Sequence, residues 1–312
     1  MNGLDLARDF YRHCRPALMA EIPDIMARAA VGLAGEGSEC LGCDDDISRD
    51  HDFGPAFCLW LPRADLADAA IRERIERALA SLPAEFGGHP SRLAPERRNG
   101  RVGPLAVEDF FGFFTGLREP APTWRDWLRI PEYHLSSCVN GEIFEDNLGE
   151  FSRWRQALAW YPRDVHLKKM AARCMVMAQA GQYNLPRVLR RGDATAAMLA
   201  AARFAEAALS LVFLLNRRYM PFYKWAGKIA GTLPFLGGNL REALDALAAH
   251  PLRGAEDLEV CEIVETFCEA AATHLRAEWG TAQPDNWLWE HGRQLLTQVE
   301  NEELRALNAL EG

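Results

Sequence analysis

Residues 35–54 read GEGSECLGCDDDISRDHDFG and combine a Gly-Ser turn with five aspartates and one histidine. Three of the aspartates are consecutive, and Asp50 and Asp52 flank His51. Like charges this close repel one another, so the segment costs free energy unless a cation or solvent takes up the field. The segment therefore indicates a cation site, with a solvated turn at Asp44, Asp45 and Asp46 as the alternative for the first three acids.

The residues on either side of this segment predict two strands. Residues 29–34 are apolar and followed by Gly35, which is typical of a buried strand, and residues 52–61 (DFGPAFCLWL) read as a second strand that ends at Pro62. Asp50 and Asp52 would open this second strand two residues apart, with both carboxylates on one face and about 5–7 Å between them. Such a pair suits two Mg²⁺ ions.

Gly37 and Ser38 follow the first predicted strand. A turn of this kind can place backbone N–H groups and a hydroxyl around phosphate oxygens, so both residues are candidate nucleotide ligands. Arg49 either contacts phosphate as well or only balances the acidic segment. His51 points to the opposite face of the strand from the two aspartates, which favours a packing role.

Composition excludes several classes of protein. The 312 residues carry a net charge of −9, which argues against broad nucleic-acid binding. The N-terminal residues lack the apolar run of a signal peptide, and no window reaches the length of uncharged apolar sequence that a membrane span needs. We therefore expect a cytoplasmic protein with no membrane partner, whose eight cysteines are reduced thiols.

Cys40 and Cys43 form a CxxC motif, but the chain has no second pair that would complete a zinc site. The pair also lies in a turn rich in Gly and Asp, whereas a redox pair would open a helix after a strand. Buried apolar packing is the preferred interpretation of both cysteines.

The pattern along the chain predicts an α+β protein with two domains. Residues 4–19 and 64–82 have helical periodicity, residues 102–107 a third strand and residues 108–116 a short helix. Beyond residue 123 the periodic segments all read as helices. We predict a small mixed-sheet α/β domain over residues 1–118 and an all-helical bundle over residues 119–312.

A Gly-Ser turn followed by Asp-x-Asp on a strand resembles the signature of the nucleotidyltransferase superfamily, which has the polymerase-β-like fold. Asp50 lies thirteen positions after Gly37, as that signature requires. The block GLAGEGSECLGCDDDISRDHDFGPAFCLWL, with later blocks at residues 140–151, 161–171 and 213–225, resembles a bacterial family of unknown function that has a nucleotidyltransferase-like N-terminal domain. The resemblance spans most of the chain but names no acceptor.

The superfamily has a third acid on a later strand, and the predicted third strand here contains none. Glu108 and Asp109 come only at the end of that strand. Glu142, Glu145 and Asp146 are the candidates from the second domain, because similar small-molecule nucleotidyltransferases use acids of a helical C-terminal domain. We favour Glu142 or Asp146 as the catalytic acid beside Asp50 and Asp52.

In the helical part, Lys224 and Arg218 are candidates for contacts to nucleotide phosphates or to the second substrate, with aromatic packing of a helix end as the alternative. Lys168 and Lys169 are expected to be solvated, and Asp193 to cap a helix. The helical domain also loosely resembles domains that accompany minimal nucleotidyltransferases in toxin–antitoxin pairs. It lacks the Arg and His spacing of the RNase version, which disfavours RNase activity.

Together these features predict a Mg²⁺-dependent nucleotidyltransferase that moves a nucleoside monophosphate from an NTP, with ATP the expected donor, to a small-molecule acceptor. The alternative is a catalytically impaired nucleotide sensor or a toxin–antitoxin-like module that binds a partner. The sequence leaves the acceptor, the base preference and the oligomeric state open.

Overall fold

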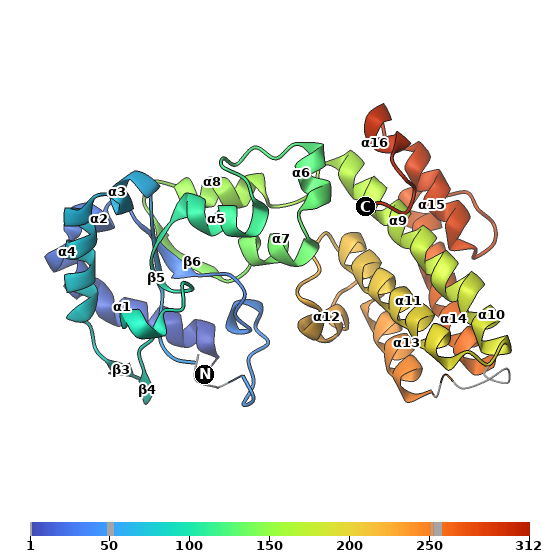
Figure 1. Cartoon of the computed structure of the whole chain (residues 1–312), viewed down its shortest axis with the longest axis horizontal. Helices are drawn as coiled ribbons and strands as arrows, with labels where there is room; N and C mark the ends of the chain where they lie inside the picture. Colours follow the sequence, from blue (N-terminus) through green and yellow to red (C-terminus); the bar gives the residue numbers. More distant parts are fainter. Residues whose placement is uncertain (1, 49–52, 251, 253–257) are drawn as a thin grey trace. The chain divides into compact units, whose positions relative to one another are not determined.

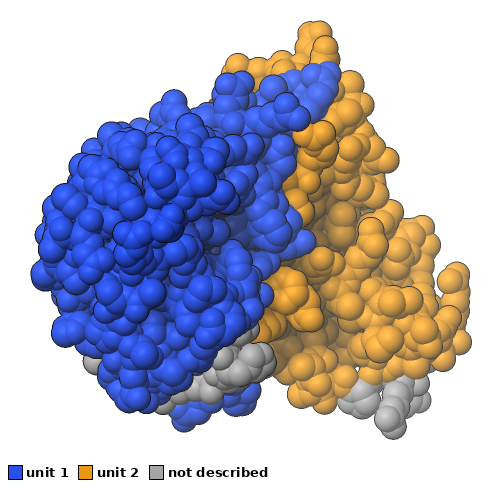
Figure 2. Space-filling view, turned by 60° about the vertical axis from the view of Figure 1, so that its left-hand side comes forward, with its two compact units in different colours: residues 1–126, 133–159 blue, residues 127–132, 160–312 orange. Residues whose placement is uncertain are grey.

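The computed structural model describes residues 2–48, 53–250, 252 and 258–312. The chain divides into two units, which Figure 2 colours separately. Unit 1 comprises residues 1–126 and 133–159, and unit 2 comprises residues 127–132 and 160–312. The protein is α+β, with one small mixed sheet in unit 1 and helices throughout unit 2.

The sheet of unit 1 has four strands in the order β5–β2–β1–β6. The strands are β1 (Ala30–Leu33), β2 (Cys58–Leu61), β5 (Gly103–Ala106) and β6 (Glu142–Asp146). β1 pairs antiparallel with β2 and β6, and β2 pairs parallel with β5. The first two strands were predicted as continuous apolar runs, and every residue of both is buried.

Helices cover both faces of this sheet (Figure 1). On one face Phe10 and Tyr11 contact Phe57, and on the other Trp60 contacts Phe110 and Phe151. Strands covered on both faces lose the alternation of polar and apolar residues, which explains the apolar runs. The helical elements of unit 1 are α1 (Gly3–Glu21), α2 (Pro23–Met26), α3 (Arg63–Ala67), α4 (Ala69–Ala80), α5 (Val107–Thr115), α7 (Glu132–Val139, whose first residue belongs to unit 2), α8 (Glu150–Ala157), and the 3₁₀ turns η1 (Glu39–Leu41) and η2 (Pro95–Arg97).

The second strand begins later than the sequence predicts. β2 starts at Cys58, and the described residues 53–57 before it are not strand. Gly54 has φ +154°, and a Cβ there would lie 2.5 Å from the Pro90 carbonyl oxygen, so the backbone passes the short hairpin of β3 (Glu85–Phe86) and β4 (His89–Pro90) instead of extending the sheet. Strand alternation therefore gives no basis for placing the carboxylates of residues 50 and 52.

The predicted boundary at residue 118 also differs from the observed division. β6 lies in the segment expected to be all helical, and it adds an edge strand to β1. All five of its residues are partly exposed, so its sequence shows no apolar face from which to predict a strand. A Cβ on Gly32 would lie 2.3 Å from the Glu142 carbonyl oxygen, so β1 and β6 need glycine to approach this closely.

Unit 2 is built around α9 (Arg163–Met177), which packs against α11 (Ala194–Leu215) and α15 (Leu288–Thr297). α9 continues through a π-helical segment, η3 (Ala178–Asn184). Asp193 caps α11 by accepting a hydrogen bond from Ala196 N, as predicted. The other helices are α6 (Trp124–Arg129, which spans the division), α10 (Leu185–Arg190), α12 (Tyr223–Ala230), α13 (Gly237–Ala249), α14 (Leu258–Trp279) and α16 (Glu302–Ala306).

α11 is, within the described residues, the one helix long and apolar enough by length and composition to cross a membrane. Core helices of soluble proteins meet the same criterion, and α11 buries residues such as Phe204, Leu211 and Phe213 in unit 2. Core packing accounts for its composition.

Two lysines of α9 correct an expectation. Lys168 and Lys169 are buried rather than solvated. The ammonium of Lys168 donates to the carbonyl oxygens of Leu307 and Asn308 at 3.4 and 2.6 Å, which fastens the C-terminal segment to α9.

Candidate functional site

The loop that follows β1 is held in place by one asparagine. Gly35 N donates to Asn140 Oδ1 at 3.0 Å, and Asn140 Nδ2 donates to Gly35 O at 2.7 Å. Gly141 N also donates to Cys40 O at 2.9 Å. The turn between α7 and β6 therefore fixes the position of the loop from both ends.

A second connection fixes that turn in its place. The Arg155 guanidinium, on α8, donates to the carbonyl oxygens of Cys138 and Asn140. Burial lowers the pKa of Arg155 from its ordinary value. The carbonyl groups at the end of α7 would otherwise lack partners, so Arg155 caps this helix and steadies Asn140.

Gly37 and Ser38 form a tight turn within the loop. The Gly37 carbonyl accepts from Cys40 N at 3.1 Å, and the Ser38 carbonyl accepts from Leu41 N at 3.1 Å and Cys43 N at 2.9 Å. Across residues 2–48 and the other described parts, no hydrogen bond is formed by the N–H groups of Gly37 and Ser38. The carbonyls are thus used internally, and two N–H groups are left for a ligand or solvent.

A carboxylate lies against this turn. A Cβ built on Gly37 would come within 2.5 Å of both carboxylate oxygens of Glu39, and Arg92 Nη1 lies 3.4 Å from Glu39 Oε1. Arg92 is 6% exposed, and its Nε has no hydrogen-bond partner among the described residues. Arg92 N donates to Pro55 O at 3.0 Å, and this contact of the segment after β4 helps to place the guanidinium beside the loop.

The central acidic residues of the sequence prediction, Asp50 and Asp52, lie outside the described residues, as does Arg49. The described ranges contain no group of three or more His, Cys, Asp or Glu side chains that could hold a metal ion. The predicted metal site therefore depends on Asp50 and Asp52.

The three acids of β6 are each held by a partner within unit 1. Arg8 forms a two-pronged ion pair with Glu142, with Nε 2.8 Å from Oε1. This guanidinium lowers the pKa of Glu142 below its ordinary value. Glu145 pairs with Arg15 of α1, and Asp146 Oδ2 accepts from Ser152 N at 2.7 Å at the start of α8.

The two acids at the start of α5 are also engaged. Glu108 Oε2 accepts from Arg63 N at 3.0 Å, and Asp109 Oδ1 lies 2.5 Å from Arg63 Nη2. These contacts tie α5 to α3. Each of the five candidates for a third acid would therefore have to leave a structural contact, or share it, to act on a substrate.

Lys224 lies on α12 of unit 2, where it is exposed and its ammonium is 4.8 Å from the centre of the Trp225 ring. Gly141, which precedes β6, donates its N–H to Cys40 O. The start of β6, at Glu142, therefore lies next to the loop that contains Gly37 and Ser38. Lys224 belongs to the other unit.

Cys40 and Cys43 are buried and are not joined in a disulfide, in agreement with the packing interpretation. Burial raises the pKa of the Cys40 thiol well above its ordinary value, and Glu39 adds to the rise. A thiol held in its neutral form is a poor nucleophile.

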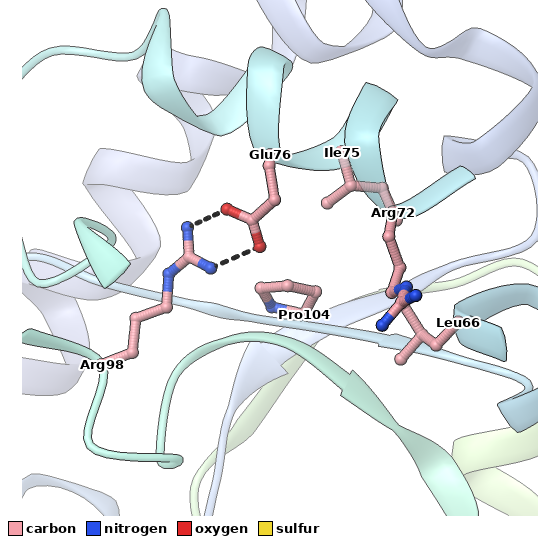
Figure 3. Close-up of a pocket in the computed structure, with 6 residues that line it drawn as sticks. All are labelled: Leu66, Arg72, Ile75, Glu76, Arg98 and Pro104. Atoms are coloured by element: carbon pink, nitrogen blue, oxygen red, sulfur yellow. Dashed lines mark hydrogen bonds and ion pairs between the residues drawn. The ribbon is translucent and has the colours of Figure 1, made fainter. Parts of the chain in front are cut away.

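A cavity of about 250 Å³ lies elsewhere in unit 1, between α3, α4 and β5 (Figure 3). Arg98 forms two parallel hydrogen bonds to Glu76 at its wall, at 2.7 and 2.8 Å. None of the predicted site residues lines it.

Sequence reasoning missed Arg92, Asn140 and Arg155. Asn140-Gly141 is a turn signal that could have suggested a fixed loop. Arg92 carries no local signal, because its role comes from a contact 53 positions away in sequence.

Parts of the chain are similar to known sequences. Residues 127–226 match the model of a family described as "Domain of unknown function (DUF4037)". A stretch of 211 residues, 67% of this chain, is 26% identical to the vacuolar protein sorting-associated protein 51 homolog of Bos taurus and covers 24% of that protein. The chain thus spans about a quarter of this relative's length. No solved structure matches the chain. The family match supports a relation to a family of unknown function.

Proposed function

We propose that the protein is a Mg²⁺-dependent nucleotidyltransferase, with a nucleotidyltransferase-like unit 1 that binds an NTP, ATP being the expected donor. It would transfer the nucleoside monophosphate to a small-molecule acceptor. The observation that carries this proposal is the turn of Gly37 and Ser38 at the end of β1, with two unused N–H groups and the buried cation of Arg92 beside it.

The residues present fit a phosphate group. The Arg92 Nε is a buried donor without a partner among the described residues, and leaving such a donor unpaired costs free energy. The Glu39 carboxylate already lies against Gly37, so an anion is accommodated at this position. Arg92 contacts that anion, as a phosphate ligand would.

Each residue then has a defined task. The N–H groups of Gly37 and Ser38, with the Ser38 hydroxyl, would orient the phosphates, and Arg92 would neutralise their charge. Asp50 and Asp52 would hold the Mg²⁺ ions. Mg²⁺ supplies a lowered pKa for an acceptor hydroxyl and charge neutralisation at the leaving pyrophosphate. Glu39 would have to turn away from Gly37 when the nucleotide binds.

The contacts of the candidate third acids favour a second function, that of a nucleotide sensor. A carboxylate with a lowered pKa is a poor proton acceptor, and Glu142 has such a pKa because Arg8 holds it. Asp146 would have to give up the N–H of Ser152. Nucleotide binding without turnover is therefore the second candidate function.

Magnesium-dependent binding is the first test. We expect each of the four NTPs, or ATP alone, to raise the melting temperature in the presence of Mg²⁺, because a ligand that binds only the folded state stabilises it. Asp50→Asn and Asp52→Asn should abolish the Mg²⁺-dependent part of this rise while the fold stays intact or becomes slightly more stable. Unchanged Mg²⁺-dependent rises in both variants would contradict the metal role.

Asp46→Asn is the matched control, because it removes one charge from the same acidic segment without touching the Asp-x-Asp pair. It should keep the full Mg²⁺-dependent rise. Pyrophosphate release over a panel of metabolites and antibiotics then separates enzyme from sensor: release that depends on Asp50 and Asp52 supports the enzyme, and binding with no release from any acceptor supports the sensor.

A further inference from the structure

One segment of unit 2 has a charge opposite to that of the whole chain. Residues 207–241 contain five Arg and Lys residues and no Asp or Glu, although the protein carries a net charge of −9. Four of these cations, Arg217, Arg218, Lys224 and Lys228, fall within twelve consecutive residues. A local excess of positive charge of this kind is a feature of surfaces that bind polyanions.

The backbone of this segment is firmly held. Asn216 Nδ2 donates to Phe235 O at 2.9 Å, and Phe235 N donates to Asn216 Oδ1 at 2.9 Å. Arg217 turns the chain out of α11 with φ +51°, and Tyr219, two residues later, is buried. α12 packs on α11 and α13. The cations are therefore displayed from a structured platform.

Aromatic rings lie between the cations on this platform. Phe222 is 46% exposed and Tyr223 75% exposed, with their ring centres 4.4 Å apart. The ammonium groups of Lys224 and Lys228 lie 4.8 and 5.8 Å from the centre of the partly exposed Trp225 ring. Stacking on a planar ligand would remove the apolar faces of these exposed rings from water, which is favourable.

Three of these cations are available to a ligand. Within the described ranges, Arg217, Arg218 and Lys224 form no ion pair with a carboxylate. Arg241, the fifth cation of the segment, is instead paired with Asp245 at 2.6 Å. The absence of neutralising acids is therefore specific to the surface formed by Arg217, Arg218, Phe222, Tyr223, Lys224 and Trp225, which we call the 217–225 surface.

We infer that the 217–225 surface binds a short single-stranded nucleic acid. Unpaired guanidinium and ammonium groups suit its phosphates, and exposed rings between them suit its unstacked bases. In residues 207–241 the large exposed apolar side chains are all aromatic, Phe222, Tyr223 and Phe235, with no exposed Leu, Ile or Met. Stacking uses ring faces, whereas insertion into a membrane also draws on aliphatic chains. The inference does not depend on the proposed nucleotidyltransferase function.

Fluorescence anisotropy of the full chain with a labelled oligonucleotide of about 12 nucleotides, as single-stranded RNA, single-stranded DNA and duplex, tests the inference. We expect the single strands to bind more tightly than the duplex, with an affinity that falls as salt rises. Arg218→Ala with Lys224→Ala should lower the slope of log affinity against log salt by about 1.4, since each single-strand phosphate contact contributes about 0.7. Tyr223→Ala should weaken binding by about 5- to 160-fold.

Unit 2 also offers matched controls. Arg190→Ala with Arg191→Ala removes the same charge from another exposed stretch of unit 2, and Tyr183→Ala removes an exposed ring that carries Arg187 over its face at 3.5 Å. These variants should bind as the parent does. Equal losses in both sets would mean a nonspecific charge effect and overturn the inference. Binding to phosphatidylserine vesicles without binding to oligonucleotides would assign the surface to membranes instead and overturn it too.

Discussion

Arg92 of unit 1 and Lys169 of unit 2 are both buried cations, but their surroundings differ. Arg92 lies beside a glycine-containing loop, with one carboxylate 3.4 Å away and a donor left without a partner among the described residues. Lys169 lies in a helical core, with its ammonium 5.1 Å from the centre of the Tyr161 ring. A cation beside a loop can exchange its partner for a ligand, whereas a cation enclosed by helices serves the fold.

The neighbours of Lys169 make a closed network. Glu132 accepts from Arg173 Nη2 at 3.2 Å and from Ser210 Oγ at 2.9 Å, and Arg173 Nε donates to the same Ser210 oxygen at 2.8 Å. Burial lowers the pKa of Lys169 to about 8, although Glu132 opposes the shift. Among these four residues, Glu132 is the one that can balance the positive charges of Lys169 and Arg173.

The largest effect should come from Glu132. Glu132→Gln would leave the buried Lys169 and the partly buried Arg173 without a carboxylate, and breaking a buried ion pair in this way costs about 3–5 kcal/mol. Urea unfolding of the variant and parent measures this loss. Glu142→Gln in unit 1 is the matched change, and because that ion pair is partly exposed it should cost about 1 kcal/mol or less. Equal losses of stability at both positions would contradict the expectation that the buried carboxylate contributes more than the partly exposed one.

The second largest effect is on the pH dependence of folding stability. Burial lowers the pKa of His166 to about 4, and its Nε2 lies 3.0 Å from Leu214 O. The unfolded chain takes up the proton near pH 6.5 and the folded chain only near pH 4, so stability is full above 6.5 and falls as pH drops to about 4. Over this pH range the shift in pKa lowers the free energy of unfolding by about 3 kcal/mol.

His166→Gln keeps a hydrogen-bond donor and removes the titration. Its urea midpoint should therefore change less between pH 7 and pH 4.5 than that of the parent. His13→Gln, at an exposed position of α1, is the control and should follow the parent curve. A His166→Gln curve that also follows the parent would show that this imidazole is not the source of the dependence.

The smallest expected effect is on nucleotide affinity, which changes at Arg92 and Glu39 should shift in opposite directions. Arg92→Gln should weaken Mg²⁺–nucleotide binding by about tenfold, because a hydrogen bond between charged groups contributes about 1.5–3 kcal/mol and part of that is recovered from solvent. Glu39→Gln should strengthen binding, because the turn no longer holds a competing carboxylate. Titration calorimetry with ATP and Mg²⁺ measures both. A loss of affinity in Glu39→Gln would assign Glu39 to nucleotide binding rather than to competition with it.

Much of the local structure could be predicted from local patterns. The apolar residues 29–34 and 58–61, the amphipathic helix near residues 64–82 and the cap at Asp193 follow from periodicity and capping chemistry, which depend on neighbours within a few positions. The helix predicted over residues 64–82 is divided at Asp68, whose carboxylate accepts from Ala70 N and caps α4. Boundaries of this kind depend on one hydrogen bond and are easily missed.

The sequence by itself determined that the protein is α+β, that a Gly-Ser turn follows its first strand, and that an acidic segment comes next, since these are properties of consecutive residues. Only the tertiary structure decided that Arg92 lies against Glu39, that residues 142–146 complete the sheet, and that Lys168 and Lys169 are buried. Each of these three outcomes depends on contacts between residues dozens of positions apart. Charge patterns along a chain cannot reveal them, because a charge in sequence is solvated or buried according to what folds over it.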